Sequence, residues 1–258
     1  TQNKKRIFEH NKSEYTIRTI KSLINNININ KDLFNKIKVS LTIIDHNSKK
    51  GDLELIKKII EQSRIDYKIY NLNVDEFPQI KILNKNNTTI EGNMRAAMAS
   101  IIKSFQVAKE ISADLIYFVE DDYIHKSECL AEMLFTYEKI ASEINEELFL
   151  CPVDYPYLYK STENTNILIG HRYHWRTIKE SLLTFMTSKK MLNKHWDLLM
   201  KMCTEEHAPF ETPLHKIYEN EVCLSPIPSL AIHCTNVNSV FGLSPNTNWK
   251  KIWDENKI

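Results

Sequence analysis

The 258-residue sequence has 34 Lys and Arg, 33 Asp and Glu, 42% hydrophobic residues and only four glycines. This charge balance argues against a protein that mainly coats phosphate backbones, because such domains concentrate basic residues on one face. The glycines stand alone, at positions 51, 92, 170 and 242, so neither a Rossmann G-x-G-x-x-G loop nor a P-loop is present. A bound nucleotide would therefore need another partner for its phosphates, such as a divalent metal held by carboxylates.

Cysteine usage and hydropathy indicate the compartment. The five cysteines are odd in number and widely spaced, which is typical of reduced thiols in the cytoplasm. Apolar runs fall far below the ~18 residues of a membrane span, and the start of the chain lacks the apolar core of a signal peptide. We expect a cytoplasmic protein; peripheral association with the inner face of the membrane, and further domains in a longer chain, are left open.

Strand and helix patterns alternate through the first half of the chain. The predicted elements, in chain order, are a strand at 6–10, a helix at 13–27, a strand at 36–44, a helix at 52–60, a strand at 66–72, a loop at 84–89, a long helix at 93–111 and a buried strand at 114–119. This alternation predicts an α/β fold with a mostly parallel central sheet flanked by helices. Ligands of such sheets bind beyond the carboxyl ends of the strands.

The second half is less regular. The predicted elements are strands at 147–153 and 167–169, helices at 189–202 and 213–219, and a strand at 222–233. Pro226 and Pro228 interrupt that last strand, which favours an edge position because proline cannot donate to a ladder. No linker or repeat divides the chain, so we expect a single domain.

Polar clusters follow three predicted strands of the first half. They are Glu9-His10-Asn11, Asp45-His46-Asn47 and Glu120-Asp121-Asp122. Alternate residues of an extended chain point the same way, so Glu120 and Asp122 face one ligand while Asp121 faces the opposite side. Carboxylates this close repel one another unless a cation is present, which predicts a site for Mg²⁺ or Mn²⁺. The alternative is a solvated acidic turn before the next helix.

Four segments of the chain resemble the family 2-like glycosyltransferases of the GT-A fold. Residues 8–23 are similar to that family's opening strand and helix, 41–48 to its second strand, 91–97 to the stretch that opens its donor-site helix, and 117–124 (YFVEDDYI) to its DXD element, with Glu120 in place of the first Asp. They occur in the family's order and cover about residues 5 to 140, the rest being weaker. The resemblance implies one GT-A domain over 1–258, with a nucleotide-sugar-binding half (1–125) and an acceptor-binding half with a C-terminal lid (126–258).

The resemblance also implies an activity: metal-dependent transfer of a sugar from a nucleotide-diphosphate donor to a glycan acceptor, with inversion, in the synthesis of a surface polysaccharide such as a capsule. Two alternatives are a non-catalytic glycan-binding or assembly module of a larger enzyme and a sugar-phosphate nucleotidyltransferase. The nucleotidyltransferase would normally need a Gly-rich loop after the first strand, and residues 8–13 contain none.

The resemblance assigns roles to individual residues. The implied metal ligands are Glu120 and Asp122, with His233 as an additional ligand; the alternative for His233 is a strand-end side chain hydrogen-bonded to backbone. The implied donor-binding residues are Glu9, His10, Asn11, Asp45, Arg95 and Asp121. Arg172 and Arg176 join them as candidates because residues 171–177 mix cations with aromatics, which suits pyrophosphate pairing and sugar stacking.

An inverting transfer needs a general base that takes the proton from the acceptor hydroxyl. The family places an acidic residue just before a helix in the second half. Glu211, which precedes Pro213, matches this best, and Glu205 and Glu206 compete with it. For each of the three, the alternative is a solvated carboxylate that flanks a helix.

Overall fold

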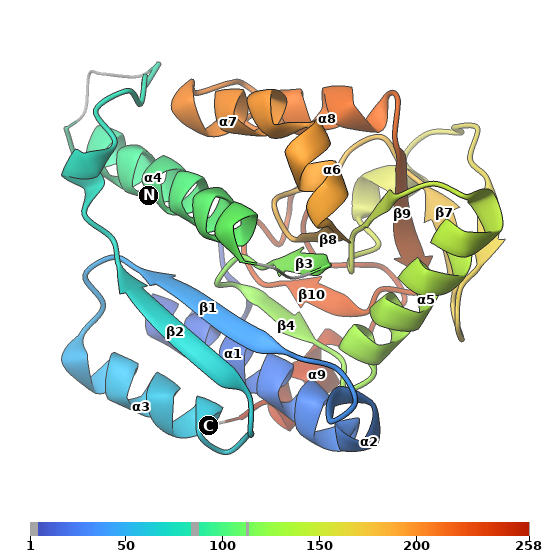
Figure 1. The fold of residues 1–258 in the computed structure, drawn as a ribbon, viewed down its shortest axis with the longest axis horizontal. Helices are drawn as coiled ribbons and strands as arrows, with labels where there is room; N and C mark the ends of the chain where they lie inside the picture. The colour runs from blue at the N-terminus through green and yellow to red at the C-terminus, as the bar shows by residue number, and fades with distance from the viewer. Residues whose placement is uncertain (1–4, 84–87, 112–113, 258) are drawn as a thin grey trace.

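The computed structural model describes residues 5–83, 88–111 and 114–257 (Figure 1). Its α-helices are α1 (Lys12–Ile29), α2 (Lys31–Phe34), α3 (Lys50–Ile60), α4 (Thr88–Glu110), α5 (Cys129–Ile144), α6 (Lys189–Lys194), α7 (Trp196–Thr204), α8 (Thr212–Tyr218) and α9 (Trp249–Glu255). Its strands are β1 (Ser40–Asp45), β2 (Asp66–Asn71), β3 (Leu115–Phe118), β4 (Tyr123–His125), β5 (Leu148–Leu150), β6 (Ile167–Ile169), β7 (His174–Thr177), β8 (Phe185–Ser188), β9 (Val222–Ile227) and β10 (Ala231–His233). Short 3₁₀ turns lie at Ile7–Glu9, Val74–Glu76 and Pro156–Tyr159.

The α/β class is confirmed, but the prediction of a mostly parallel sheet is wrong. The largest sheet has the order β3-β8-β5-β9-β7-β6, and only β5 and β9 pair in parallel within it. A second sheet pairs β1 with β2 in parallel, and a third pairs β4 with β10 antiparallel. Strand direction was misjudged because β8, from the second half of the chain, enters between β3 and β5. Hydrophobic periodicity gives no information about such long-range pairing.

The first half of the chain packs helices on the β1–β2 pair. Ile20 and Ile24 of α1 share a buried cluster with Ile56 and Ile60 of α3, and Ile43 of β1 packs against it. In Figure 1, α1 and α3 lie to one side of the β1–β2 pair and α4 to the other. Each of the four buried isoleucines contributes roughly 1.5–3 kcal/mol by its burial, and this packing holds β1 against α1 and α3.

The larger core joins α4 to the six-stranded sheet and to the helices of the second half. Met98, Ile102 and Phe105 recur at the i, i+4, i+7 spacing of one helix face and are at most 1% exposed. They share a cluster with Phe185 of β8 and Leu199 of α7. This core holds β3 in place, and the acidic triplet follows β3 after the single residue Val119.

Three predicted elements differ in the structure. Residues 6–10 are not a strand: Phe8 and Glu9 have positive φ values of 61° and 54°, and Arg6 alone bridges to Thr235. The helix predicted at 189–202 breaks at His195 into α6 and α7. The predicted strand at 222–233 is two strands, β9 and β10.

The edge position predicted for the proline-containing strand is also wrong, because β9 lies between β5 and β7. Its pairing with β5 stops at Leu224, opposite Leu150, whereas Pro226 is paired only with Trp175 of β7. Pro226 therefore has a strand neighbour on one side only. As at a sheet edge, no strand on the other side needs an N–H donor from this residue, so proline is tolerated there.

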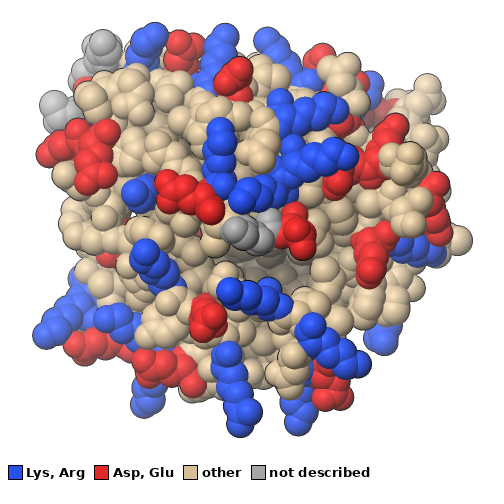
Figure 2. All heavy atoms as spheres, in the orientation of Figure 1, with Lys and Arg blue, Asp and Glu red and all other residues tan. Residues whose placement is uncertain are grey.

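The surface charges and the cysteines are arranged as the composition indicates. Figure 2 shows Lys and Arg interspersed with Asp and Glu on the face in view. All five cysteines are buried and free of disulfides. Among the described residues, no helix combines the length and the apolar character needed to cross a membrane.

Candidate active site

The acidic triplet lies in the connection between β3 and β4, and backbone contacts to two other segments hold it there. The N–H of Glu120 donates to Thr184 Oγ1 at 3.0 Å, just before β8. The carbonyl of Asp122 accepts from the N–H of Cys234 at 2.9 Å, just after β10. The ends of strands from both halves of the chain therefore fix the positions of the carboxylates.

The pairing of β4 with β10 brings His233 to the triplet. His233 Nε2 lies 3.6 Å from Asp122 Oδ2, and the His233 ring stacks on Tyr123 with centroids 4.7 Å apart. His233 Nδ1 lies 2.7 Å from the carbonyl oxygen of Phe241. Because a carbonyl only accepts, Nδ1 carries the proton in this contact, and Nε2 is the nitrogen directed at the carboxylate.

The charges in this cluster are coupled. Burial, followed by the neighbouring Asp122 carboxylate, raises the pKa of Glu120 to about 8. Burial acts against the charged forms of Asp122 and His233, but their mutual attraction outweighs it: the pKa of Asp122 is lowered and that of His233 is raised. At neutral pH Glu120 is thus largely protonated, while Asp122 and His233 each favour the charged form of the other.

Glu120 also has an unmatched polar atom. Its Oε2 is buried and has no hydrogen-bond partner among the described residues. A buried oxygen without a donor costs roughly 1–3 kcal/mol, so such atoms require an explanation. A cation bound at this oxygen would remove the cost and would also relieve the repulsion between Glu120 and Asp122.

The fit to a metal can be tested on the side chains themselves. Across residues 5–83, 88–111 and 114–257, no three His, Cys, Asp or Glu side chains stand close enough together to form a ready-made metal site. The donor types nevertheless suit Mg²⁺ or Mn²⁺: two carboxylates, one with an unpartnered oxygen, and an imidazole nitrogen. A metal site here would require the side chains of Glu120 and Asp122 to move closer together.

Asp121 faces a different neighbour from the other two carboxylates. Its Oδ2 lies 3.1 Å from Lys12 Nζ and accepts a hydrogen bond from Thr16 Oγ1 at 3.2 Å. Both partners lie in the first two turns of α1, so the 9–11 segment that precedes this helix also comes close to the triplet. Within that segment, His10 stacks on Trp253 of α9 with centroids 5.4 Å apart.

The remaining donor candidates of the first half lie on separate elements. Asp45 ends β1, and its carbonyl accepts from Leu72 N–H at 2.7 Å. Arg95 of α4 donates to the carbonyl of Ile80 at 3.3 Å and lies 3.7 Å from Glu91. Among the described residues, no hydrogen bond or ion pair links Asp45 or Arg95 to the triplet.

The three candidate bases have different surroundings in the structure. The charge of Glu211 contributes to the raised pKa of Glu120, so Glu211 lies within electrostatic reach of the triplet. Glu205 instead pairs with Lys81 at 3.1 Å, and this hydrogen bond lowers its pKa. Glu206 accepts from the N–H of Leu83 at 2.7 Å. Glu205 and Glu206 thus contact the 81–83 segment, whereas Glu211 lies near the cluster.

The two arginines of the 171–177 segment lie away from the acidic triplet. Arg176 is 8% exposed, forms an ion pair with the buried Asp154, and places its guanidinium 4.5 Å from the ring centroid of Tyr159. Arg172 lines a pocket at the other end of β4. Among the described residues, neither has a hydrogen bond or ion pair with the triplet.

Sequence reasoning missed several residues that support the cluster. Thr184 binds the backbone of Glu120, the hydroxyl of Thr235 hydrogen-bonds to Asp122, and Phe241 accepts from His233. Thr235 carries a usable signal, because it lies two residues after His233 on an extended segment. No sequence pattern indicates the roles of Thr184 or of the Phe241 carbonyl.

No family model matches the chain, and no curated protein matches it.

Proposed function

We propose that this chain is a metal-dependent glycosyltransferase with a GT-A-like fold, which transfers a sugar from a nucleotide-diphosphate donor to a glycan acceptor with inversion. One observation supports the proposal: Asp122 lies 3.6 Å from His233 where β4 and β10 pair, and the charges of both, with that of Glu211, act on the buried Glu120. The same cluster contains the segment that resembles a DXD element. Surface polysaccharide synthesis in the cytoplasm, with peripheral membrane association, belongs to this proposal.

The cluster would hold the metal through Glu120 Oε2, Asp122 Oδ2 and His233 Nε2. When bound, Mg²⁺ or Mn²⁺ would neutralise the charge of the leaving nucleoside diphosphate. The Phe241 carbonyl keeps the proton of His233 on Nδ1, which leaves Nε2 as the ligating nitrogen. Tyr123 stacks against the imidazole and limits its rotation.

Glu211 would act as the general base, taking the proton from the acceptor hydroxyl onto a carboxylate oxygen as that hydroxyl attacks the anomeric carbon. Glu205 and Glu206 suit this role less well. Glu205 already pairs with Lys81, which lowers its pKa and weakens it as a base, and Glu206 accepts from backbone. Glu211 is the one of the three whose charge acts on the cluster.

The donor would lie between the end of β1 and the 9–11 segment, with Asp45, Glu9, His10 and Asn11 near the base and Arg95 near the phosphates. The contacts of Asp121 with Lys12 and Thr16 support this arrangement, because they draw the start of α1 toward the triplet. Arg172 and Arg176 are left out of the donor site, since their contacts lie elsewhere.

A thermal-shift screen tests the proposal. UDP- and GDP-sugars are added with and without Mn²⁺, and a CMP-sugar, which carries a single phosphate, serves for comparison. We expect one class of diphosphate donor to raise the melting temperature only when the metal is present. Asp122→Ala should abolish this shift and the transfer. Asp66→Ala, an exposed carboxylate at the start of β2, is the matched control and should retain both. Full transfer activity in Asp122→Ala would overturn the assignment.

A second variant separates chemistry from donor binding. Glu211→Gln should retain the metal-dependent thermal shift and lose about 10²–10⁴-fold in kcat, which is the usual contribution of a general base. Glu205→Gln, made in parallel, should keep most of its activity. The reverse pattern would assign the base to Glu205.

A further inference from the structure

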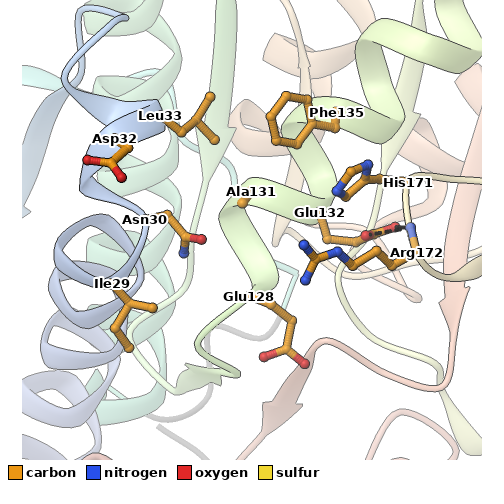
Figure 3. A pocket seen from close by; sticks show the side chains of 10 residues that line it. All are labelled: Ile29, Asn30, Asp32, Leu33, Glu128, Ala131, Glu132, Phe135, His171 and Arg172. Carbon is orange, nitrogen blue, oxygen red and sulfur yellow. Dashed lines mark hydrogen bonds between the residues drawn. The ribbon is translucent and has the colours of Figure 1, made fainter.

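The acidic triplet precedes β4, and a pocket lies beyond the other end of this strand. Figure 3 shows the side chains that line the pocket. Residues at the end of α1, in α2, at the start of α5 and in the loop between β6 and β7 line it, and its volume is about 250 Å³. A neighbouring pocket of about 380 Å³ shares Ile29, Asn30, Glu128 and Arg172 with it. The two therefore form one continuous depression. It contains none of the residues of the candidate active site.

The wall formed by the loop between β6 and β7 is rigid. The carboxylate of Glu132, which is 2% exposed, accepts from the N–H groups of Arg172 at 2.9 Å and Tyr173 at 3.2 Å, and from Trp175 Nε1 at 3.2 Å. At Gly170, a Cβ atom would lie 2.4 Å from the Trp175 side chain, so the loop needs glycine to pack this closely. The wall is thus formed before any ligand arrives, which lowers the entropic cost of binding.

Polar groups from both walls face the space between them. Figure 3 shows the side chains of Arg172 and Asn30 pointing toward each other across the pocket. The guanidinium of Arg172 has no hydrogen-bond or ion-pair partner among the described residues. Asn30 Nδ2 donates to the carbonyls of Asn26 at 2.9 Å and Ser127 at 3.1 Å, which leaves its amide oxygen as an acceptor.

A carboxylate completes the polar set. Glu128 accepts from the hydroxyl of Tyr173 at 2.7 Å and from that of Ser127 at 3.1 Å. Burial opposes its ionisation, but these hydrogen bonds prevail and its pKa is lowered, so Glu128 is charged at neutral pH. A simple anion would be repelled by Glu128 and by Asp32, which also lines the pocket, and a simple cation would meet the guanidinium of Arg172. Hydroxyl groups suit both, because they accept from the guanidinium and donate to the carboxylate.

The rest of the lining is mixed, with Asp32 and His171 among apolar side chains. Leu33 and Phe135 flank the pocket from opposite sides, with Ala131 between them, and Phe135 packs on His171 with ring centroids 4.8 Å apart. Ile29, at 65% exposed, lies at the rim. Apolar walls with a few placed polar groups are typical of small-molecule sites. A sugar ring matches this combination, since it presents C–H faces to the walls and hydroxyls at its edge.

We infer that this pocket binds one unit of a neutral saccharide. Arg172, Glu128 and the Asn30 oxygen bind its hydroxyls, and Leu33 and Phe135 contact its C–H face. Its role rests on the proposed function: the pocket would hold a distal unit of the glycan acceptor away from the reaction centre. Saccharide binding itself needs neither donor nor metal.

Saturation-transfer NMR tests the inference without donor or metal. The probes are the methyl glycosides of glucose, galactose, mannose, rhamnose and N-acetylglucosamine, with methyl-labelled protein to locate the contact. We expect at least one glycoside to bind and to shift the Ile29, Leu33 and Ala131 methyl signals. Arg172→Ala should weaken it at least about ten-fold, as the loss of a charge-assisted hydrogen bond predicts. Arg64→Ala, an exposed arginine beside β2, should not change it.

Three results would overturn the inference: no binding by any of the five glycosides, binding that Arg172→Ala leaves unchanged, or binding of inorganic phosphate at the same methyl signals in place of a glycoside. Asp122→Ala separates this inference from the proposed function. That variant should bind the glycoside normally, so loss of transfer with retained saccharide binding concerns the active site alone.

Discussion

Glu120→Gln should stabilise the protein at alkaline pH while removing its proposed activity. The pKa of Glu120 is raised from 4.5 to about 8, so the folded state keeps a proton that the unfolded state releases above pH 4.5. Stability is therefore full below pH 4.5 and falls as the pH rises toward 8. At about 1.4 kcal/mol per pKa unit, the loss is about 3 kcal/mol at pH 7 and approaches about 5 kcal/mol above pH 8. Glutamine keeps the shape and cannot ionise, so the variant escapes this loss.

Urea denaturation at pH 5, 7 and 8.5 measures the effect, with the free energy of unfolding compared at constant slope. Between pH 5 and 8.5, the wild type should lose up to about 4 kcal/mol relative to Glu120→Gln. The exposed Glu143→Gln serves as the control and should follow the wild type. Mn²⁺ should stabilise the wild type more at pH 8.5 than at pH 5, because a cation offsets the ionised carboxylate. Parallel pH curves for the wild type and Glu120→Gln would refute the reasoning.

Three further predictions concern packing and buried charge. Gly170→Ala should destabilise the fold by about 1–3 kcal/mol in urea denaturation, since the new methyl group meets the Trp175 ring, and an unchanged midpoint would contradict this close approach. Trp253→Ala should lower the free energy of unfolding by about 3–5 kcal/mol, because its buried indole packs on Phe8 and His10. It should also lower donor affinity, and a normal thermal shift with donor would show that α9 does not position residues 8–10. Burial lowers the pKa of His125 from 6.5 to about 3, so only the unfolded state takes up its proton below pH 6.5, and stability should fall by about 2 kcal/mol between neutral pH and pH 5. His125→Gln should remove most of that acid sensitivity, and an equally acid-sensitive variant would assign it to other groups.

Local patterns predicted most of the elements but not how they associate. The i, i+4, i+7 spacing of Met98, Ile102 and Phe105 predicts a helix face, and the structure buries that face. The same reasoning failed at residues 6–10, where Phe8 and Glu9 adopt positive φ beneath the C-terminal tryptophans. Tertiary packing overrides a strand-like pattern there, and five residues carry too little local preference to resist it.

The sequence by itself determined that carboxylates follow an apolar strand, because hydrophobicity is a property of a few adjacent residues. The prediction that this strand is buried is wrong: β3 lies at the edge of its sheet, and only Ile116 of its four residues is buried. Only the tertiary structure decided which partners the carboxylates meet. His233 reaches Asp122 because β10 pairs with β4 across more than a hundred residues of chain. Glu205 pairs with Lys81, which lies far from it in the sequence, whereas the charge of Glu211 acts on Glu120. No local pattern encodes this difference. Strand direction, the choice among candidate bases and the separate pocket at Arg172 all depend on long-range packing, which one-dimensional periodicity cannot specify.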